Sequence, residues 1–187
     1  MRKLVLILLL LCSSPAFHIF AQSIDEKIEE IRRIYKQTNE QIAAAERNFA
    51  ESNIYLSELI VNKGGTMYPA VGNFKSTIRF YYAFGNREEN PYPNRLLKIT
   101  VLTDRAAHNE SYEYLFDREG NLLFYLEKTG EEARPESRFY FSYNKAIRIL
   151  RGQKIADPNS PQERAAVKAV LAQAGKLTGI FRNSLEN

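Results

Sequence analysis

Through the middle of the chain, apolar residues recur at every second position in short segments that turn signals separate. The first such segment places Tyr112, Tyr114 and Phe116 on one side, the two-residue period typical of a half-buried β-strand. Residues 117–121, Asp-Arg-Glu-Gly-Asn, follow it. They predict a hairpin turn, because Gly120 can take the positive φ that a bulged three-residue loop requires.

The apolar pattern also predicts the register of this hairpin. If Phe116 lies opposite Leu122, then Tyr114 lies opposite Phe124, and one face of the hairpin is wholly apolar. A shift of one residue would destroy that face.

A second hairpin is expected shortly afterwards, with Asn144 and Lys145 as its two-residue turn. Asn tolerates the positive φ of a type I′ turn. This turn sets Phe141 against Arg148 on one face of the hairpin.

Other alternating segments predict further strands over residues 54–61, 74–84 and 96–103, so that about seven strands lie between residues 54 and 151. None of the stretches between them has the length and period of a helix. The pattern therefore predicts a single antiparallel β-meander sheet rather than a parallel, doubly wound one.

Helical periodicity appears only at the two ends of this region. Ser23 and Glu26 form a capping box that predicts a helix over residues 23–50, and Ser160 followed by Pro161 predicts a second helix over residues 160–182. The long first helix carries one continuous apolar stripe. We expect this stripe to pack on the chain's own sheet or on the second helix, with a coiled-coil partner as the alternative. The prediction is a single α+β domain over residues 22–187.

The first 21 residues are expected to be a signal peptide. Arg2 and Lys3 precede an apolar run that is too short to span a bilayer, and Ala21 is a small residue suited to cleavage. These features predict an exported protein, periplasmic or extracellular, with no transmembrane segment after cleavage. A lipid anchor at Cys12 is an alternative.

Cleavage would change the chemistry available to the protein. Cys12 is the only cysteine, and His108 would be the only histidine left, so we expect no disulfide, no metal site and no cofactor. Loss of Arg2 and Lys3 would also remove two of the +4 formal charges, which weakens a nucleic-acid-binding interpretation.

Two patterns could support catalysis. His108 has Asp104 and Glu110 nearby and could act as a general base, although no nucleophile motif accompanies it, and a solvated loop histidine is the preferred interpretation. Glu113 and Glu127 are expected on one face of the central hairpin, where they could form the carboxylate pair of a hydrolase.

The preferred hypothesis is an exported, non-enzymatic binding protein whose partner is a protein or another envelope component. Phe141, Tyr143 and Arg148 suggest an aromatic and cationic binding surface, and Tyr92, between Pro91 and Pro93 in a polar loop, is a further candidate. The alternatives are a carrier that holds an apolar ligand between a curved sheet and a helix, and the carboxylate-dependent hydrolase. No catalytic residue is assigned.

Overall fold

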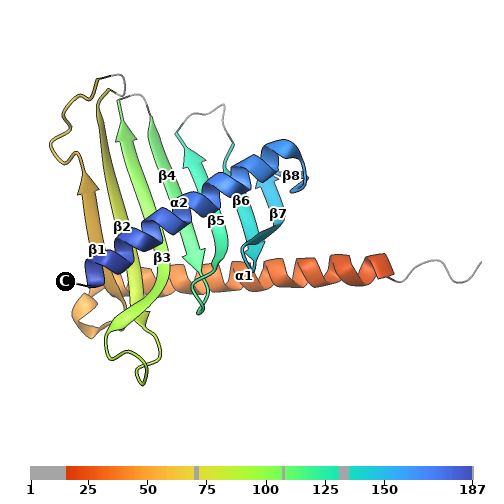
Figure 1. The fold of residues 1–187 in the computed structure, drawn as a ribbon, viewed down its shortest axis with the longest axis horizontal. Helices are drawn as coiled ribbons and strands as arrows, with labels where there is room; N and C mark the ends of the chain where they lie inside the picture. Colours follow the sequence, from red (N-terminus) through yellow and green to blue (C-terminus); the bar gives the residue numbers. More distant parts are fainter. Residues whose placement is uncertain (1–15, 70–71, 107, 131–134, 187) are drawn as a thin grey trace, which may run out of the picture.

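The structure, a computed structural model, describes residues 16–69, 72–106, 108–130 and 135–186. Two long helices enclose eight strands in the order α1 (Ala16–Arg47), the 3₁₀ helix η1 (Phe49–Glu51), β1 (Tyr55–Val61), β2 (Phe74–Phe84), β3 (Pro93–Arg105), β4 (Asn109–Phe116), β5 (Leu122–Thr129), β6 (Ser137–Ser142), β7 (Lys145–Arg151), β8 (Lys154–Ala156) and α2 (Pro161–Leu185). The strands form one sheet in sequence order, each antiparallel to the next (Figure 1). The predicted α+β meander with a helix at each end is confirmed, and the additional short strand β8 follows the predicted range.

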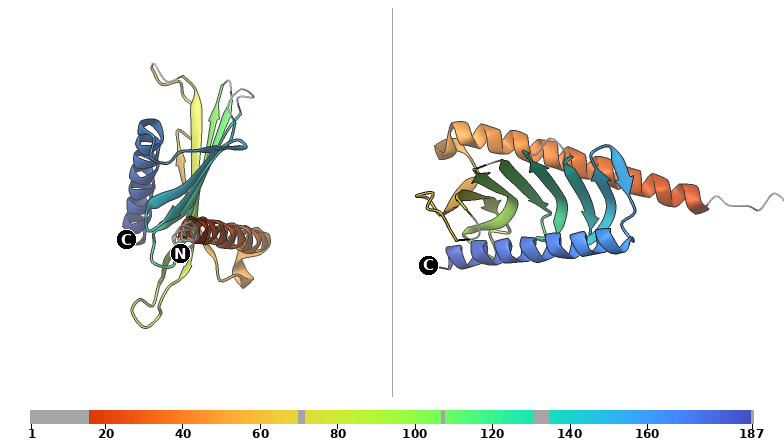
Figure 2. Two further views of the ribbon diagram at one scale, coloured as in Figure 1. Left: turned by 90° about the vertical axis from the view of Figure 1, so that its right-hand side faces the viewer. Right: turned by 90° about the horizontal axis from the view of Figure 1, so that it is seen from above.

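The two helices lie on opposite faces of the sheet (Figure 2). The α2 face carries a core of sheet residues that includes Phe80, Ile99, Tyr114, Tyr125 and Phe139. The α1 face carries a second core that includes Leu115, Phe124 and Tyr140. Because successive residues of a strand point to opposite faces, a strand covered on both sides is apolar throughout, and residues 122–126 of β5 are all buried for this reason.

The apolar stripe of α1 packs on the protein's own sheet, as expected. Ile28 and Ile31 are buried against β4 to β6. Farther along the helix, Ile42 and Ala45 pack on Tyr81 of β2. Full burial of each isoleucine side chain contributes roughly 1.5–3 kcal/mol, so α1 is attached along most of its described length.

The start of the first helix differs from the prediction. α1 begins at Ala16 and passes through Ser23 without interruption. No Gly or Pro lies between Ala16 and Ser23, so nothing in the sequence ends the helix before the capping-box residues. Residues 1–15, which include Cys12 and most of the predicted signal peptide, lie outside the described residues. Within the described ranges, neither helix combines the length and the apolar character needed to cross a bilayer.

The turn of the central hairpin forms as predicted. The backbone N–H of Asn121 donates to the Asp117 carboxylate at 2.7 Å. Gly120 has a φ of 83°, a value that a residue with a side chain rarely adopts.

The register of this hairpin was predicted correctly only next to the turn. Phe116 pairs with Leu122, but a β-bulge then shifts the pairing, and Tyr114 lies opposite Tyr125 instead of Phe124. The extra residue, Leu123, moves every later side chain of β5 to the other face. No local pattern indicates this shift, because with a helix on each side both faces of β5 are apolar.

The second hairpin turns one residue earlier than predicted. Tyr143 and Asn144 are the two turn residues, with φ of 49° and 59°, as a type I′ turn requires. Asn144 also donates to the side chain of Asn121 at 3.2 Å and accepts from the backbone of Leu122 at 3.3 Å. These contacts join the two turns and favour the observed turn over one centred on Asn144 and Lys145.

Candidate functional site

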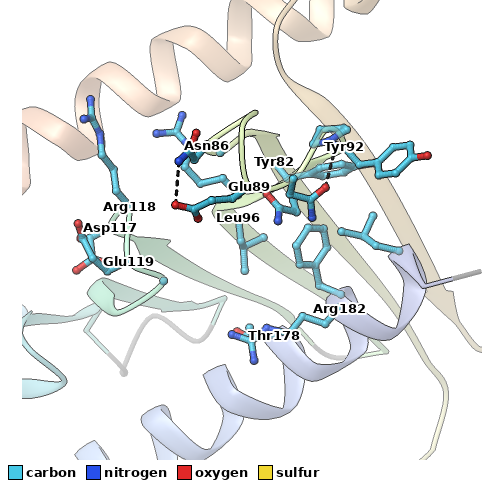
Figure 3. Close-up of a pocket in the computed structure, with 18 of the residues that line it drawn as sticks. Tyr82, Asn86, Glu89, Tyr92, Leu96, Asp117, Arg118, Glu119, Thr178 and Arg182 are labelled. Atoms are coloured by element: carbon cyan, nitrogen blue, oxygen red, sulfur yellow. Dashed lines mark hydrogen bonds between the residues drawn. The ribbon is translucent and has the colours of Figure 1, made fainter.

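Two depressions lie on the α2 side of the molecule. The larger, which we call the end cleft, has a volume of about 950 Å³ and lies between the loop that joins β2 to β3, the turn that joins β4 to β5, and the last turns of α2 (Figure 3). The second, which we call the tyrosine groove, has a volume of about 600 Å³ and runs between the sheet and the earlier part of α2. Both volumes are within the range of small-molecule sites.

The wall of the end cleft is formed by an irregular part of the sheet. The pairing of β2 with β3 shifts twice near the cleft, between Tyr81 and Tyr82 and between Ala83 and Phe84. Bulges of this kind redirect side chains and occur frequently beside functional sites. Gly85 follows directly, and a Cβ added there would approach the Oδ1 of Asn94 to 3.0 Å. A larger residue at position 85 would therefore displace this part of the wall.

The loop that closes the end cleft is held by its own asparagines. Asn86 accepts from the backbone of Glu88 at 3.1 Å and donates to the Glu89 carboxylate at 2.9 Å. Asn90 accepts from the backbone of Tyr92 at 2.9 Å. Figure 3 shows Asn86, Glu89 and Tyr92 on this loop, which lies across the cleft from α2.

Arg95 is the residue of the end cleft that most clearly lacks a partner. Its Nε is one of two buried side-chain nitrogen or oxygen atoms in the described part of the chain without a hydrogen-bond partner. A buried donor without an acceptor costs roughly 1–3 kcal/mol. Arg182 of α2 also lines the cleft and makes no ion pair with a described residue. The cleft thus offers guanidinium groups to a ligand that carries acceptor oxygens.

The tyrosine groove exists because α2 presents small side chains to the sheet. Ala166 and Ala169 leave space above Tyr112, Tyr114 and Tyr125 of the sheet. The centroids of Tyr112 and Tyr125 are 6.4 Å apart, and those of Tyr114 and Tyr125 are 5.0 Å apart.

A polar network forms one border of the tyrosine groove. Glu110 accepts from Arg105, from Tyr112 and, at the same 3.1 Å, contacts the ring of His108. Burial alone would raise the pKa of Glu110, but the hydrogen bonds from His108, Arg105 and Tyr112 outweigh it and lower this pKa. Burial and the charge of Glu110 raise the pKa of Tyr112 to about 12. His108, expected as a solvated loop residue, is half-buried in this network, and its carboxylate neighbour is Glu110.

The four residues predicted to bind a partner do not form one surface. Phe141 is fully buried on the α2 face. Arg148 lies on the opposite face, where it forms an ion pair with Asp25 of α1 at 2.8 Å. A bulge between Tyr140 and Phe141 separates the two, so that Arg148 pairs with Tyr140 rather than with Phe141.

The two exposed members of that set lie in different places. Tyr143 is 90% exposed at the turn between β6 and β7. Tyr92 is 73% exposed and is the only one of the four that lines the end cleft.

The predicted carboxylate pair is not formed. Glu113 pairs with Leu126 on the α1 face, whereas Glu127 pairs with Tyr112 on the α2 face, so the sheet separates them. The bulge at Leu123 is the cause, because it reverses the facing of the β5 side chains relative to β4. A hydrolase based on Glu113 and Glu127 has no support from this geometry.

Glu113 instead belongs to a network that attaches α1 to the sheet. Lys98, 6% exposed, donates at 2.6 Å to both Glu113 and Asn39. The hydroxyl of Tyr35 also donates to Glu113, at 2.7 Å, and burial and this contact raise the pKa of Tyr35. Each of these groups has a hydrogen-bond or ion-pair partner within the network, so we assign the network a structural role.

The space under α1 is smaller than either site on the α2 side. A depression of about 280 Å³ lies beside α1 and is lined in part by Arg32, Lys128, Glu136 and Arg138. An apolar ligand enclosed by the long helix and the sheet would meet these charges rather than an apolar cavity.

Comparison with known proteins identifies no similar protein. No protein-family model, curated protein or solved structure matches the chain. Within the described ranges, no three His, Cys, Asp or Glu side chains form a group that could hold a metal ion. The functional argument therefore depends on the geometry of the end cleft and the tyrosine groove.

Proposed function

We propose that this protein is an exported, non-enzymatic binding protein, and that the end cleft holds a ligand or a segment of a partner that presents acceptor oxygens to Arg95. The observation that carries this proposal is the buried Nε of Arg95 without an acceptor. A carboxylate, a phosphate or a carbonyl oxygen would satisfy that donor.

The surroundings of Arg95 support a polar ligand. The side chains that can make hydrogen bonds in the end cleft come from the β2–β3 loop, from the sheet and from α2; they include Tyr82, Asn86, Asn94, Thr178 and Arg182. Carboxylates also line the cleft, and its surface is more polar than apolar, so placed polar groups would fix the orientation of a ligand.

A thermal-unfolding experiment with defined probes tests the binding proposal. Acetate, inorganic phosphate and glucose would be added in turn to the purified chain, because a ligand that binds only the folded state raises Tm. We expect at least one of the two anions to raise Tm. Arg95→Gln should abolish that increase. Arg87→Gln should keep it, because Arg87 is on the adjoining β2–β3 loop but stacks on Phe84 at 4.0 Å and does not line the cleft.

Two results would overturn this proposal. One is a Tm that none of the three probes changes. The other is an Arg95→Gln variant that shows the same increase as the unmodified chain.

The export part of the proposal is supported by the basic and apolar pattern that ends at Ala21. The α1 side chains described in contact with the sheet start at Ile24, so removal of residues 1–21 would leave those contacts in place. Expression of the full chain in a bacterium, followed by intact-mass measurement, should yield a chain that begins at Gln22. A diacylated chain beginning at Cys12 would indicate the lipid anchor instead, and an uncleaved cytosolic chain would contradict export.

A further inference from the structure

We propose that the tyrosine groove is a separate binding site for an organic ammonium ion, held by the carboxylate of Glu127 and the half-buried ring of Tyr112, with the buried rings of Tyr114 and Tyr125 beneath them. This inference does not depend on the end cleft, because no residue lines both sites: Leu177 of α2 lines the groove and Phe181 of α2 lines the end cleft. It assigns a ligand class to a surface for which the sequence suggested none.

Glu127 differs from the other carboxylates on this side of the sheet. Glu110 is bound by Arg105, and Glu163 is bound by Arg151 through two contacts of 3.2 and 2.6 Å. The side chain of Glu127 lines the groove, but its carboxylate forms neither a hydrogen bond nor an ion pair with any residue in the described ranges. Of the two described carboxylates that line the groove, Glu110 and Glu127, only Glu127 has no cation bound to it.

The cross-strand order explains why no arginine reaches Glu127. Tyr112, Glu127, Ser137 and Arg151 lie opposite one another in a row across β4, β5, β6 and β7. Arg151 is two strands from Glu127, a separation of roughly 10 Å at the usual strand spacing. It donates to Ser137 at 2.8 Å and to Glu163, and its guanidinium lies 4.8 Å from the centre of the Phe139 ring.

The aromatic rings beside Glu127 favour a cation over a neutral ligand. Tyr112 is the direct cross-strand neighbour of Glu127, and Tyr125 lies between Tyr112 and Tyr114 in the stack. A cation beside such rings is attracted to the negative faces of the rings in addition to the carboxylate. An anion would gain nothing here, because Arg105 and Arg151 already have carboxylate partners.

The tyrosine hydroxyls do not compete with Glu127 for the cation. Burial, together with neighbouring Tyr and Glu127, raises the pKa of Tyr114 and Tyr125. Both side chains are therefore neutral at physiological pH, and the only negative charge in the middle of the groove is that of Glu127. The alanines of α2 leave room for methyl groups on the nitrogen.

Isothermal titration with matched probes tests the proposal on the intact chain. The probes are choline, its neutral isostere dimethylbutanol, and N-acetyl-lysine methylamide, which represents the side chain of a protein. We expect at least one of the cations to bind and the neutral isostere to bind at least ten-fold more weakly. The tighter of the two cations would indicate whether the natural ligand is a small amine or a lysine side chain.

Variants assign the binding to the groove. Glu127→Gln keeps the shape of the side chain and should weaken cation binding at least ten-fold. Tyr112→Leu should weaken it roughly five-fold, as loss of one ring contact predicts. Glu40→Gln, which removes an exposed acid of α1 far from the groove, should bind as the unmodified chain does.

Three outcomes would overturn the proposal. They are no measurable binding of either cation, equal binding of choline and dimethylbutanol, and unchanged cation binding by Glu127→Gln in a variant whose Tm shows that it is folded. None of them bears on the end cleft, so the two proposals fail separately.

Discussion

The two helices cover the same sheet in different ways. The α1 side is closed by large apolar residues and by the buried network of Lys98, Glu113 and Tyr35, and its depression is only about 280 Å³. The α2 side has an apolar core as well, but it leaves depressions of about 950 and 600 Å³ at the end of the helix and beside it.

The side chains of the helices account for this difference. α1 places Ile28, Ile31 and Tyr35 against the strands that it crosses. α2 places Ala166 and Ala169 over the tyrosines, and only Val170, Ala174, Leu177 and Phe181 reach the core fully. We infer from this comparison that α1 serves stability and that α2 shapes both proposed binding sites.

A large effect is expected from the buried charge on the α1 side. Lys98→Met would leave the partly buried Glu113 without its cation; loss of one partner of a fully buried pair costs about 3–5 kcal/mol, and the 20% exposure of Glu113 places this variant at or below the lower end of that range. Urea unfolding would measure this decrease in the free energy of unfolding. The double variant Lys98→Met/Glu113→Leu should lose less than the two single variants together, since the unpaired charge is gone. Strict additivity would show that the ion pair contributes no coupling.

A matched pair of leucines tests whether α1 covers its face of the sheet more completely than α2 covers the other face. Leu115 on the α1 face is 1% exposed and Leu177 on α2 is 2% exposed, so truncation to alanine removes the same atoms from equally buried sites. Such changes cost about 2–5 kcal/mol. We expect Leu115→Ala near the upper end and Leu177→Ala near the lower end, because the space left by Leu177 opens into the tyrosine groove. The reverse order in urea unfolding would contradict the comparison.

Alkaline titration tests the tyrosines of the α2 side. The folded-state pKa of Tyr112 is raised to about 12, and burial raises those of Tyr114 and Tyr125 as well. A raised folded-state pKa leaves stability complete below the ordinary tyrosine pKa near ~10 and lowers it as pH rises through the folded value. The free energy of unfolding should therefore fall between these pH values, and tyrosinate absorbance should follow unfolding.

Two phenylalanine variants make this comparison specific. Tyr125→Phe should leave stability at neutral pH nearly unchanged and lessen the alkaline decline, because its hydroxyl makes no hydrogen bond with a described residue. Tyr35→Phe should lower stability at neutral pH by about 1–3 kcal/mol, because Glu113 loses a donor at 2.7 Å. Equal neutral-pH stabilities of the two variants would show that the Tyr35 contact is unimportant.

The smallest effect is expected outside the interfaces that α1 and α2 form with the sheet. Tyr143 has a φ of 49° in the β6–β7 turn, a conformation that Asn adopts more readily. Tyr143→Asn should raise the free energy of unfolding by about 0.5–1 kcal/mol. A decrease would indicate that the exposed ring makes a stabilising contact.

Local signals in the sequence predicted the helices, strands and turns, but not which face of the sheet each strand side chain occupies. The Asp117–Asn121 turn and the Ser160 cap form where expected. The bulge at Leu123 was not predictable, because β5 is apolar on both sides and any register buries it. The separation of Glu113 from Glu127 and of Phe141 from Arg148 follows from such bulges.

The end cleft could be predicted only in part. Tyr92 was predicted as a candidate from its place in a polar loop, but Arg95 was not predicted. The amino-acid sequence does not distinguish a buried arginine that lacks an acceptor from an arginine in solvent. Whether the Nε of Arg95 has an acceptor depends on the side chains around it, and the two register shifts between β2 and β3 determine which side chains those are.

The amino-acid sequence by itself determined the succession of helix, meander and helix, because period and turn chemistry are properties of neighbouring residues. Tertiary structure alone decided that the helices cover opposite faces and that one of them leaves open sites. Those features depend on which side chains meet across strands and helices, and a single inserted residue in a β-ladder exchanges the two faces without any change in the local pattern.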